Sequence, residues 1–165
     1  MSAFGLITGG IMCAASCYAG VKIKRVYSSR SRFFYEFRDF LGDLKGGIVI
    51  YKKPLTELIS DYTSGRDGAF IDFLKECDAC IRNGTREAIS LKRPAFLPQK
   101  YFKDVESFFK EVGKSGIDEQ QRLIEYHFNK AEQTGDALKK LSQKDGTMYF
   151  KLLILLGVTI MIIAV

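Results

Sequence analysis

Two sets of residues in this sequence have types and a spacing that could do chemistry, a Cys-x-x-Cys pair and a single histidine. Cys77 and Cys80 match the spacing of thiol redox motifs and would supply two of the four ligands of a zinc site. Redox motifs of this kind stand at a helix N-terminus, where the helix dipole lowers the pKa of a thiol. Here the pair falls late in a helix expected over residues 70–81, so we predict a buried Cys77 beside a partly exposed Cys80.

The rest of the chain does not complete an active site. The other cysteines, Cys13 and Cys17, fall in an apolar N-terminal segment, and His127 has no cluster of ligand residues beside it. The glycine-rich stretches at 65–68 and 113–116 lack the lysine and hydroxyl residue that end a phosphate loop. We therefore expect no enzyme, no cofactor and no metal. A membrane-tethered redox protein that uses Cys77 and Cys80 is the least favoured alternative.

Charged residues are confined to the middle of the chain. The 165 residues are 47% hydrophobic, which fits one domain, but residues 1–21 and 152–165 contain no charged side chain. The net charge of +6 comes from a basic cluster before the first acid, since residues 33–151 carry 20 basic and 19 acidic side chains. A charge excess at one place does not match a nucleic-acid-binding face, so no nucleic acid partner is expected. This N-terminal basic cluster consists of Lys22, Lys24, Arg25, Arg30 and Arg32.

Residues 1–21 predict a membrane-spanning helix. As a helix they would reach about 31 Å, and the hydrocarbon core of a bilayer is about 30 Å thick. A cleaved signal peptide would carry its positive charge before the apolar stretch, whereas here the charge follows it. The positive-inside rule then places the chain from residue 22 onward in the cytoplasm and the N-terminus on the opposite side.

Residues 148–165 predict a second span. Residues 152–165 alone would reach about 21 Å, but residues 148–165 reach about 27 Å if the Lys151 ammonium extends to the interface. Tyr149 and Phe150 suit an interfacial aromatic belt, and Lys151 lies on the same side as the N-terminal basic cluster. A buried C-terminal core helix is the alternative, although only Thr159 could supply a polar face. Both termini are therefore expected on the side opposite the middle of the chain.

Residues 22–147 are expected to form an all-α, antiparallel bundle of about six helices in the cytoplasm. Gly46 and Gly47 interrupt the first apolar stripe and are expected at a close backbone contact. Asp118 is predicted to be the N-cap of the last helix, with Gln121 as its partner in a capping box, and Gly146 is predicted to stop that helix. Apolar residues recur at helical spacing in residues 33–48, 55–62, 70–81, 101–112 and 124–138, and a short helix is expected near residues 85–89.

Four stretches occur in a fixed order along nearly the whole chain. They are the basic cluster ending at Arg32, residues 54–58 after Tyr51, residues 109–113 leading into 118–121, and residues 148–151 before Gly157. With an apolar segment at each end, this order resembles stage III sporulation protein AB of endospore-forming bacteria.

The resemblance implies a helical domain similar to the cytoplasmic domain of the F-type platform protein of type II secretion systems and type IV pili. It also implies membership of the complex that the mother cell builds in its membrane around the forespore. The implied partners are the cytoplasmic secretion-type ATPase of that complex, other sporulation channel membrane proteins and membrane lipids, with self-association as a further expectation. The alternative is a platform subunit of a type II secretion or type IV pilus-like system outside sporulation, but such subunits usually carry the helical domain twice.

Two surface regions are candidates for this role. The N-terminal basic cluster and Lys151 are expected to set the orientation at the membrane interface. Asp118, Glu119 and Gln121, at the start of a helix, are the candidate partner contact, with helix capping as the alternative. Asp118 and Glu119 are adjacent and point apart on a helix, so they do not form an acid/base pair.

Overall fold

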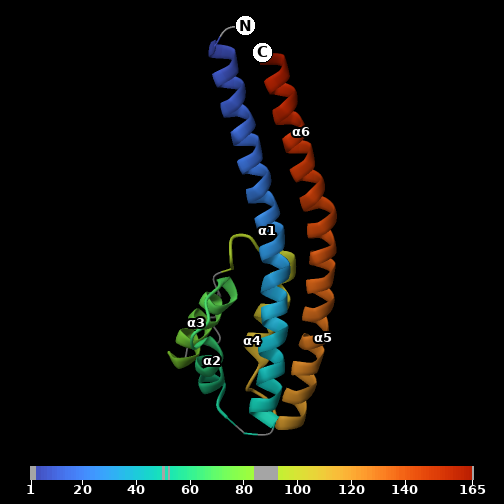
Figure 1. The fold of residues 1–165 in the computed structure, drawn as a ribbon. Coiled ribbons are helices and arrows are strands. Elements are labelled where there is room, and N and C mark those ends of the chain that lie inside the picture. The colour runs from blue at the N-terminus through green and yellow to red at the C-terminus, as the bar shows by residue number, and fades with distance from the viewer. Residues whose placement is uncertain (1–2, 50, 52, 84–92, 165) are drawn as a thin grey trace. The chain divides into compact units, whose positions relative to one another are not determined.

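A single long helix, α1 (Ala3–Val49), begins the fold and joins the apolar N-terminal segment to the first apolar stripe. The computed structural model describes the backbone of residues 3–49, 51, 53–83 and 93–164 (Figure 1). Side chains are described for the same residues except 3–10, 12, 13, 49, 160, 161, 163 and 164. Every regular element in this described part is a helix, which confirms the all-α prediction.

The remaining helices follow the predicted periodicity. Pro54 stands directly before α2 (Leu55–Thr63) and Pro98 directly before α4 (Gln99–Glu111), and the backbone of each proline is extended. The short helix predicted near residues 85–89 falls outside the described residues. The elements after α1 are α2 (Leu55–Thr63), α3 (Ala69–Arg82), α4 (Gln99–Glu111), α5 (Ile117–Leu141), a π-helix (Ser142–Gly146) and α6 (Thr147–Ala164).

The chain divides into two units, Arg32–Gly135 on the one hand and Met1–Ser31 with Asp136–Val165 on the other. We call the first the bundle unit and the second the terminal unit. α1 and α5 contribute residues to both units, because each helix runs through a boundary. The predicted division into residues 1–21, 22–147 and 148–165 is one of membrane topology and stays a prediction.

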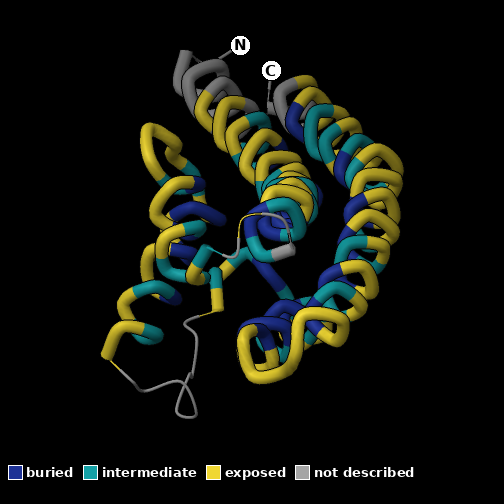
Figure 2. Tube along the Cα trace, turned by 90° about the horizontal axis from the view of Figure 1, so that it is seen from below, coloured by how far each residue is buried: buried dark blue, intermediate teal, exposed yellow. Residues whose placement is uncertain are grey.

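Phenylalanine rings form the core of the bundle unit. The ring of Phe70 on α3 lies 5.2 Å from Phe33, 5.9 Å from Phe37 and 6.0 Å from Phe40, measured between centroids. Buried positions lie along one side of the helices and exposed positions along the other (Figure 2), as a 3.6-residue period requires. The buried phenylalanines are Phe33, Phe34, Phe37, Phe40, Phe70, Phe73, Phe102, Phe108 and Phe109.

α1 continues through the Gly46 and Gly47 pair without a break. A β-carbon added at Gly47 would lie 2.3 Å from one methyl carbon of Leu58, whereas one added at Gly46 would meet nothing within 4 Å. The close contact predicted for the pair is therefore confirmed at Gly47 and wrong for Gly46. The missing side chain of Gly47 is what lets Leu58 of α2 lie against the α1 backbone.

Two predicted helix ends are wrong. α5 begins at Ile117, so Asp118 lies in its first turn, where its charge suits the helix dipole, and it is not the N-cap. The Gln120 backbone N–H donates to the Gly116 carbonyl at 2.9 Å, and the Gln120 side-chain amide donates to the Ser115 carbonyl at 3.2 Å. The contacts at this end of α5 are therefore made by Gln120 with Gly116 and Ser115.

Gly146 does not stop the last predicted helix. It is the final residue of the π-helix, through which α5 continues into α6. Gly146 is buried, and a β-carbon added there would lie 3.7 Å from the β-carbon of Tyr27 on α1. Close packing within the terminal unit therefore explains this glycine better than helix termination does.

Within the terminal unit, α1 and α6 approach each other closely. A β-carbon added at Gly20 would lie 3.0 Å from the Phe150 ring, and the Lys24 ammonium lies 5.7 Å from the centroid of the same ring. Within the described residues, no helix has both the length and the apolar character needed to cross a membrane. The side chains of residues 1–10, 12, 13, 160, 161 and 163–165, a large part of the two predicted spans, lie outside that description, and the spans stay predictions.

Candidate functional site

Three of the five side chains in the N-terminal basic cluster have a partner in the fold. Lys24 lies over an aromatic ring, as described above, and the Arg30 guanidinium lies 5.0 Å from the centroid of Tyr27. The Arg32 Nε donates to Glu36 Oε1 at 2.7 Å, one helical turn further along α1. An exposed pair of this kind contributes only about 0.3–0.5 kcal/mol.

The other two members of the cluster are exposed and line one hollow. Lys22 and Arg25 border a space of about 390 Å³ together with Cys17, Tyr18 and Val21. Neither cation forms a salt bridge with any residue in the described part of the chain. Two unpaired cations beside apolar side chains form a surface that suits an anion with an apolar body.

α6 exposes an unusual number of large apolar side chains. Lys151, the predicted interfacial lysine, is exposed near the start of the helix, beside Tyr149 and Leu152. Leu155 is 67% exposed and Ile162 is 71% exposed. Apolar side chains at such exposure mark a surface that contacts lipid or another protein. The exposed apolar residues of the terminal unit are Ile11, Tyr18, Val21, Leu141, Met148, Tyr149, Leu152, Leu155, Leu156, Val158 and Ile162.

The predicted partner contact at the start of α5 divides into two kinds of residue. Asp118 and Glu119 are exposed and form no ion pair within the described residues. Gln121 is half-buried and hydrogen-bonds to Glu125, whose carboxylate accepts from Lys45 Nζ of α1 at 2.6 Å. That lysine lowers the pKa of Glu125. Gln121 therefore belongs to a contact between α5 and α1, and only the two acids are free to meet a partner.

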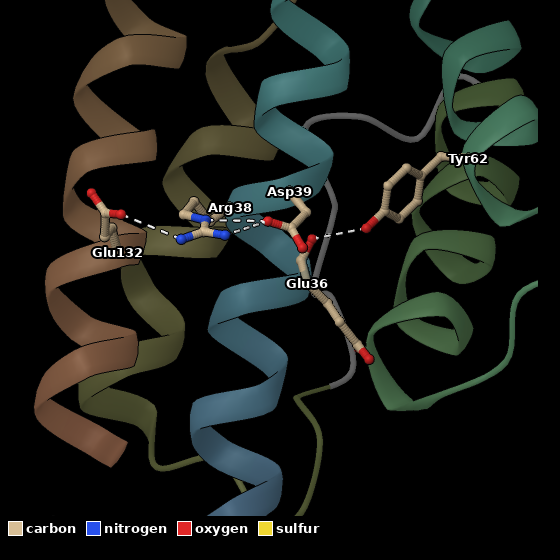
Figure 3. Close-up of polar contacts among 5 residues, drawn as sticks. All are labelled: Glu36, Arg38, Asp39, Tyr62 and Glu132. Atoms are coloured by element: carbon tan, nitrogen blue, oxygen red, sulfur yellow. Dashed lines mark hydrogen bonds and ion pairs between the residues drawn. The ribbon is translucent and has the colours of Figure 1, made fainter. Parts of the chain in front are cut away.

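Sequence reasoning missed a polar network that holds α2 and α5 against α1 (Figure 3). Arg38 donates to Asp39 at 2.7 Å on its own helix and to Glu132 of α5 at 3.3 Å. The Tyr62 hydroxyl of α2 donates to the backbone carbonyl of Glu36 at 3.1 Å, and burial raises the pKa of Tyr62. Arg38 and Glu132 lie 94 positions apart in the chain, and no local pattern relates residues at that distance.

The Cys-x-x-Cys pair lies at the end of α3, as predicted. Cys77 is fully buried and Cys80 is partly exposed. Burial is the main cause that raises the pKa of Cys77, and the charges of Cys80 and Glu76 raise it further. A thiol that resists ionisation is a poor nucleophile and a poor metal ligand, so Cys77 acts as a packing residue.

Alkylation of the native protein is expected to distinguish Cys77 from Cys80 by their rates of modification. A maleimide at pH 7.5 should modify Cys80 much faster than Cys77, because Cys77 is buried and its pKa is raised. The measurement is mass spectrometry of peptides after timed labelling in a Cys13→Ser, Cys17→Ser background. Labelling in denaturant is the control and should make the two rates similar. Equal native rates would contradict the packing role of Cys77.

His127 of α5 is also a packing residue. The residue is 4% exposed, and its ring lies 5.3 Å from the Phe108 ring, measured between centroids. Burial lowers the pKa of His127, against the opposing charges of Glu111 and Asp104. Among the described residues, no group of three or more histidine, cysteine or acidic side chains could hold a metal ion.

The buried histidine makes stability depend on pH. Because the folded pKa of His127 lies below its unfolded value of about 6.5, the unfolded state binds more protons between these values. The free energy of unfolding should therefore fall as the pH drops below about 6.5. Urea unfolding of the full chain in detergent between pH 5 and 7.5 measures this, and His127→Gln should flatten the dependence. An equally steep dependence in both proteins would contradict the prediction.

Comparison with known proteins identifies one family. The family model of stage III sporulation protein AB matches residues 5–165. No curated protein and no solved structure matches the chain significantly. Since the family model covers nearly the whole chain, the protein belongs to the stage III sporulation protein AB family.

Proposed function

We propose that this protein is a membrane-anchored, non-enzymatic component of the complex that links the mother cell to the forespore. The bundle unit serves as a cytoplasmic platform that couples the secretion-type ATPase of the complex to the membrane assembly. Membership of the stage III sporulation protein AB family supports the sporulation role. The proposed location is the mother-cell membrane around the forespore, with both termini on the side opposite the bundle unit.

The exposed apolar surface of α6 is the observation that carries membrane anchoring. Full burial of a side chain such as Leu155 or Ile162 is worth about 1.5–3 kcal/mol, and both are mostly exposed here. The hydroxyl of Thr159, the one polar side chain of residues 152–165, donates to the Leu155 carbonyl at 2.9 Å. A helix that satisfies its polar group internally and exposes apolar side chains is suited to lipid.

The surface of the bundle unit supports the platform role. Its core of packed aromatic rings holds the helices in a fixed arrangement, so a force applied to one helix is transmitted to the others. Asp118 and Glu119 present two acids without ion-pair partners among the described residues. Acids at a protein surface increase the rate of encounter with a basic partner, so this contact requires a basic surface on the ATPase.

Deletion of the gene tests the sporulation role. We expect few heat-resistant spores and forespores that stall after engulfment, with normal vegetative growth and secretion. Complementation with Cys77→Ala, Cys80→Ser should restore spores, because the thiols do no chemistry in this proposal. Normal sporulation of the deletion strain would overturn the proposal and leave a secretion or pilus platform outside sporulation as the better candidate.

Charge reversal tests the contact with the ATPase. Asp118→Lys, Glu119→Lys should reduce the ATPase that co-purifies with the full chain from detergent extracts. Asp72→Lys, Glu76→Lys is the matched control, because it reverses two exposed acids of α3 in the same unit. Equal co-purification with both variants would overturn the assignment of the α5 acids. No ATPase with the unmodified chain would overturn the platform role itself.

A further inference from the structure

The side of α1 that faces α6 can be identified from three residues of the terminal unit. Gly20 lies against the Phe150 ring, Lys24 lies over the same ring, and Tyr27 lies against Gly146. These α1 positions are separated by four and three residues, so they share one face of the helix. The cationic group of Lys24 is therefore directed toward α6 and its aromatic ring.

Lys22 and Arg25 lie on the opposite side of α1. At about 100° per residue, they are rotated by about 130° to 170° from the face that contacts α6. Both side chains are exposed, and both line the hollow of about 390 Å³ that also involves Tyr18. Their positions differ by three residues, which places their β-carbons about 5–6 Å apart. Two cations at this spacing can hold one phosphate between them.

A second hollow adjoins the first at Lys22. It has a volume of about 380 Å³ and is otherwise lined by Ala19, Ile23, Val26 and Tyr27. Apart from the lysine at its edge, its walls are aliphatic and aromatic. An occupant of both hollows must combine an anionic group with a hydrocarbon chain. A free phosphate ion has no apolar part that could fill the second hollow.

We propose that Lys22 and Arg25 bind the headgroup phosphate of an anionic phospholipid, with an acyl chain in the adjoining apolar hollow. The proposal rests on the membrane anchoring proposed above. It goes further because it separates a lipid-binding pair from Lys24, Arg30 and Arg32, which have partners within the fold. The charge of the pair favours an anionic lipid such as phosphatidylglycerol over a zwitterionic one.

Native mass spectrometry of the full chain in detergent tests the proposal. Phosphatidylglycerol and phosphatidylcholine with the same acyl chains are added at equal concentration, and the bound fraction of each is measured. We expect the unmodified protein to prefer phosphatidylglycerol by about tenfold or more. Lys22→Gln, Arg25→Gln should abolish the preference. The matched control is Lys24→Gln, Arg30→Gln, which removes the same charge from the same helix. This control should keep most of the preference for phosphatidylglycerol.

Four outcomes would overturn the lipid site. Equal loss of preference in the test and control variants would mean that net charge alone attracts the lipid. Displacement of phosphatidylglycerol by millimolar inorganic phosphate would identify a simple anion site. Cell fractionation distinguishes a failure of the lipid site from a failure of the proposed function. Recovery of the chain in the soluble fraction overturns both proposals. Recovery in the membrane without a lipid preference overturns only the lipid site.

Discussion

Replacing Phe70 by alanine is expected to lower the free energy of unfolding by about 3–5 kcal/mol, the usual cost of truncating a buried phenylalanine. Phe70 has no exposed surface, and its ring packs near the rings of Phe33, Phe37, Phe40 and Tyr62. The loss includes edge contacts between aromatic rings, which add about 0.5–1.5 kcal/mol per pair beyond the buried area. A total stability of about 5–15 kcal/mol would be reduced by a large fraction.

Urea unfolding of the full chain in detergent, followed by circular dichroism, measures the effect of Phe70→Ala. Tyr51→Ala is the control, because Tyr51 is 71% exposed and its truncation should change stability by less than about 0.5 kcal/mol. Hydrogen exchange provides a second measurement, in which α3 amides should lose protection in Phe70→Ala. A loss no larger than that of the control would contradict the aromatic core described for the bundle unit.

Replacing Gly47 by leucine is expected to cost about 1–3 kcal/mol, because the new side chain would occupy the place of Leu58. The matched control is Gly46→Leu. Space is open around Gly46, and a leucine there should stabilise the helix by up to about 0.8 kcal/mol. Adjacent glycines in one helix should thus respond to the same change with opposite signs, as measured by urea unfolding.

A double-mutant cycle connects the Gly47 effect to Leu58. If the two side chains compete for one space, Gly47→Leu should cost much less in a Leu58→Ala background than in the unmodified chain. Additive effects would show that Gly47 is required for a reason other than its contact with α2.

Much of the fold follows from local patterns in the sequence. The stripe that begins at Phe33 predicted a buried helix face, and the apolar spacing of residues 55–62 predicted α2. Helical periodicity is a property of neighbouring residues, so it can be recognised without knowledge of distant contacts. The burial of Cys77 could be predicted for the same reason, because its position on the apolar stripe of α3 is local.

Helix ends were harder to predict. The sequence predicted Asp118 as the N-cap of α5, but Gly116 and Gln120 form the contacts at the N-terminus of this helix. The sequence also predicted that the last helix ends at Gly146, although that residue lies inside a continuous run of helix. Capping residues and helix-interior residues have overlapping preferences that differ by only about 1 kcal/mol, and tertiary packing exceeds this difference.

The sequence alone was enough for the all-α class, the order of the helices, the concentration of positive charge after the first apolar segment and the resemblance to the stage III sporulation protein AB family. Only the tertiary structure distinguished residues of equal type. It separated Gly47 from Gly46, and it separated the unpaired cations Lys22 and Arg25 from Lys24. The physical reason is that composition and periodicity are local, whereas a partner such as Leu58 or Phe150 is brought to its place by packing between helices far apart in the chain.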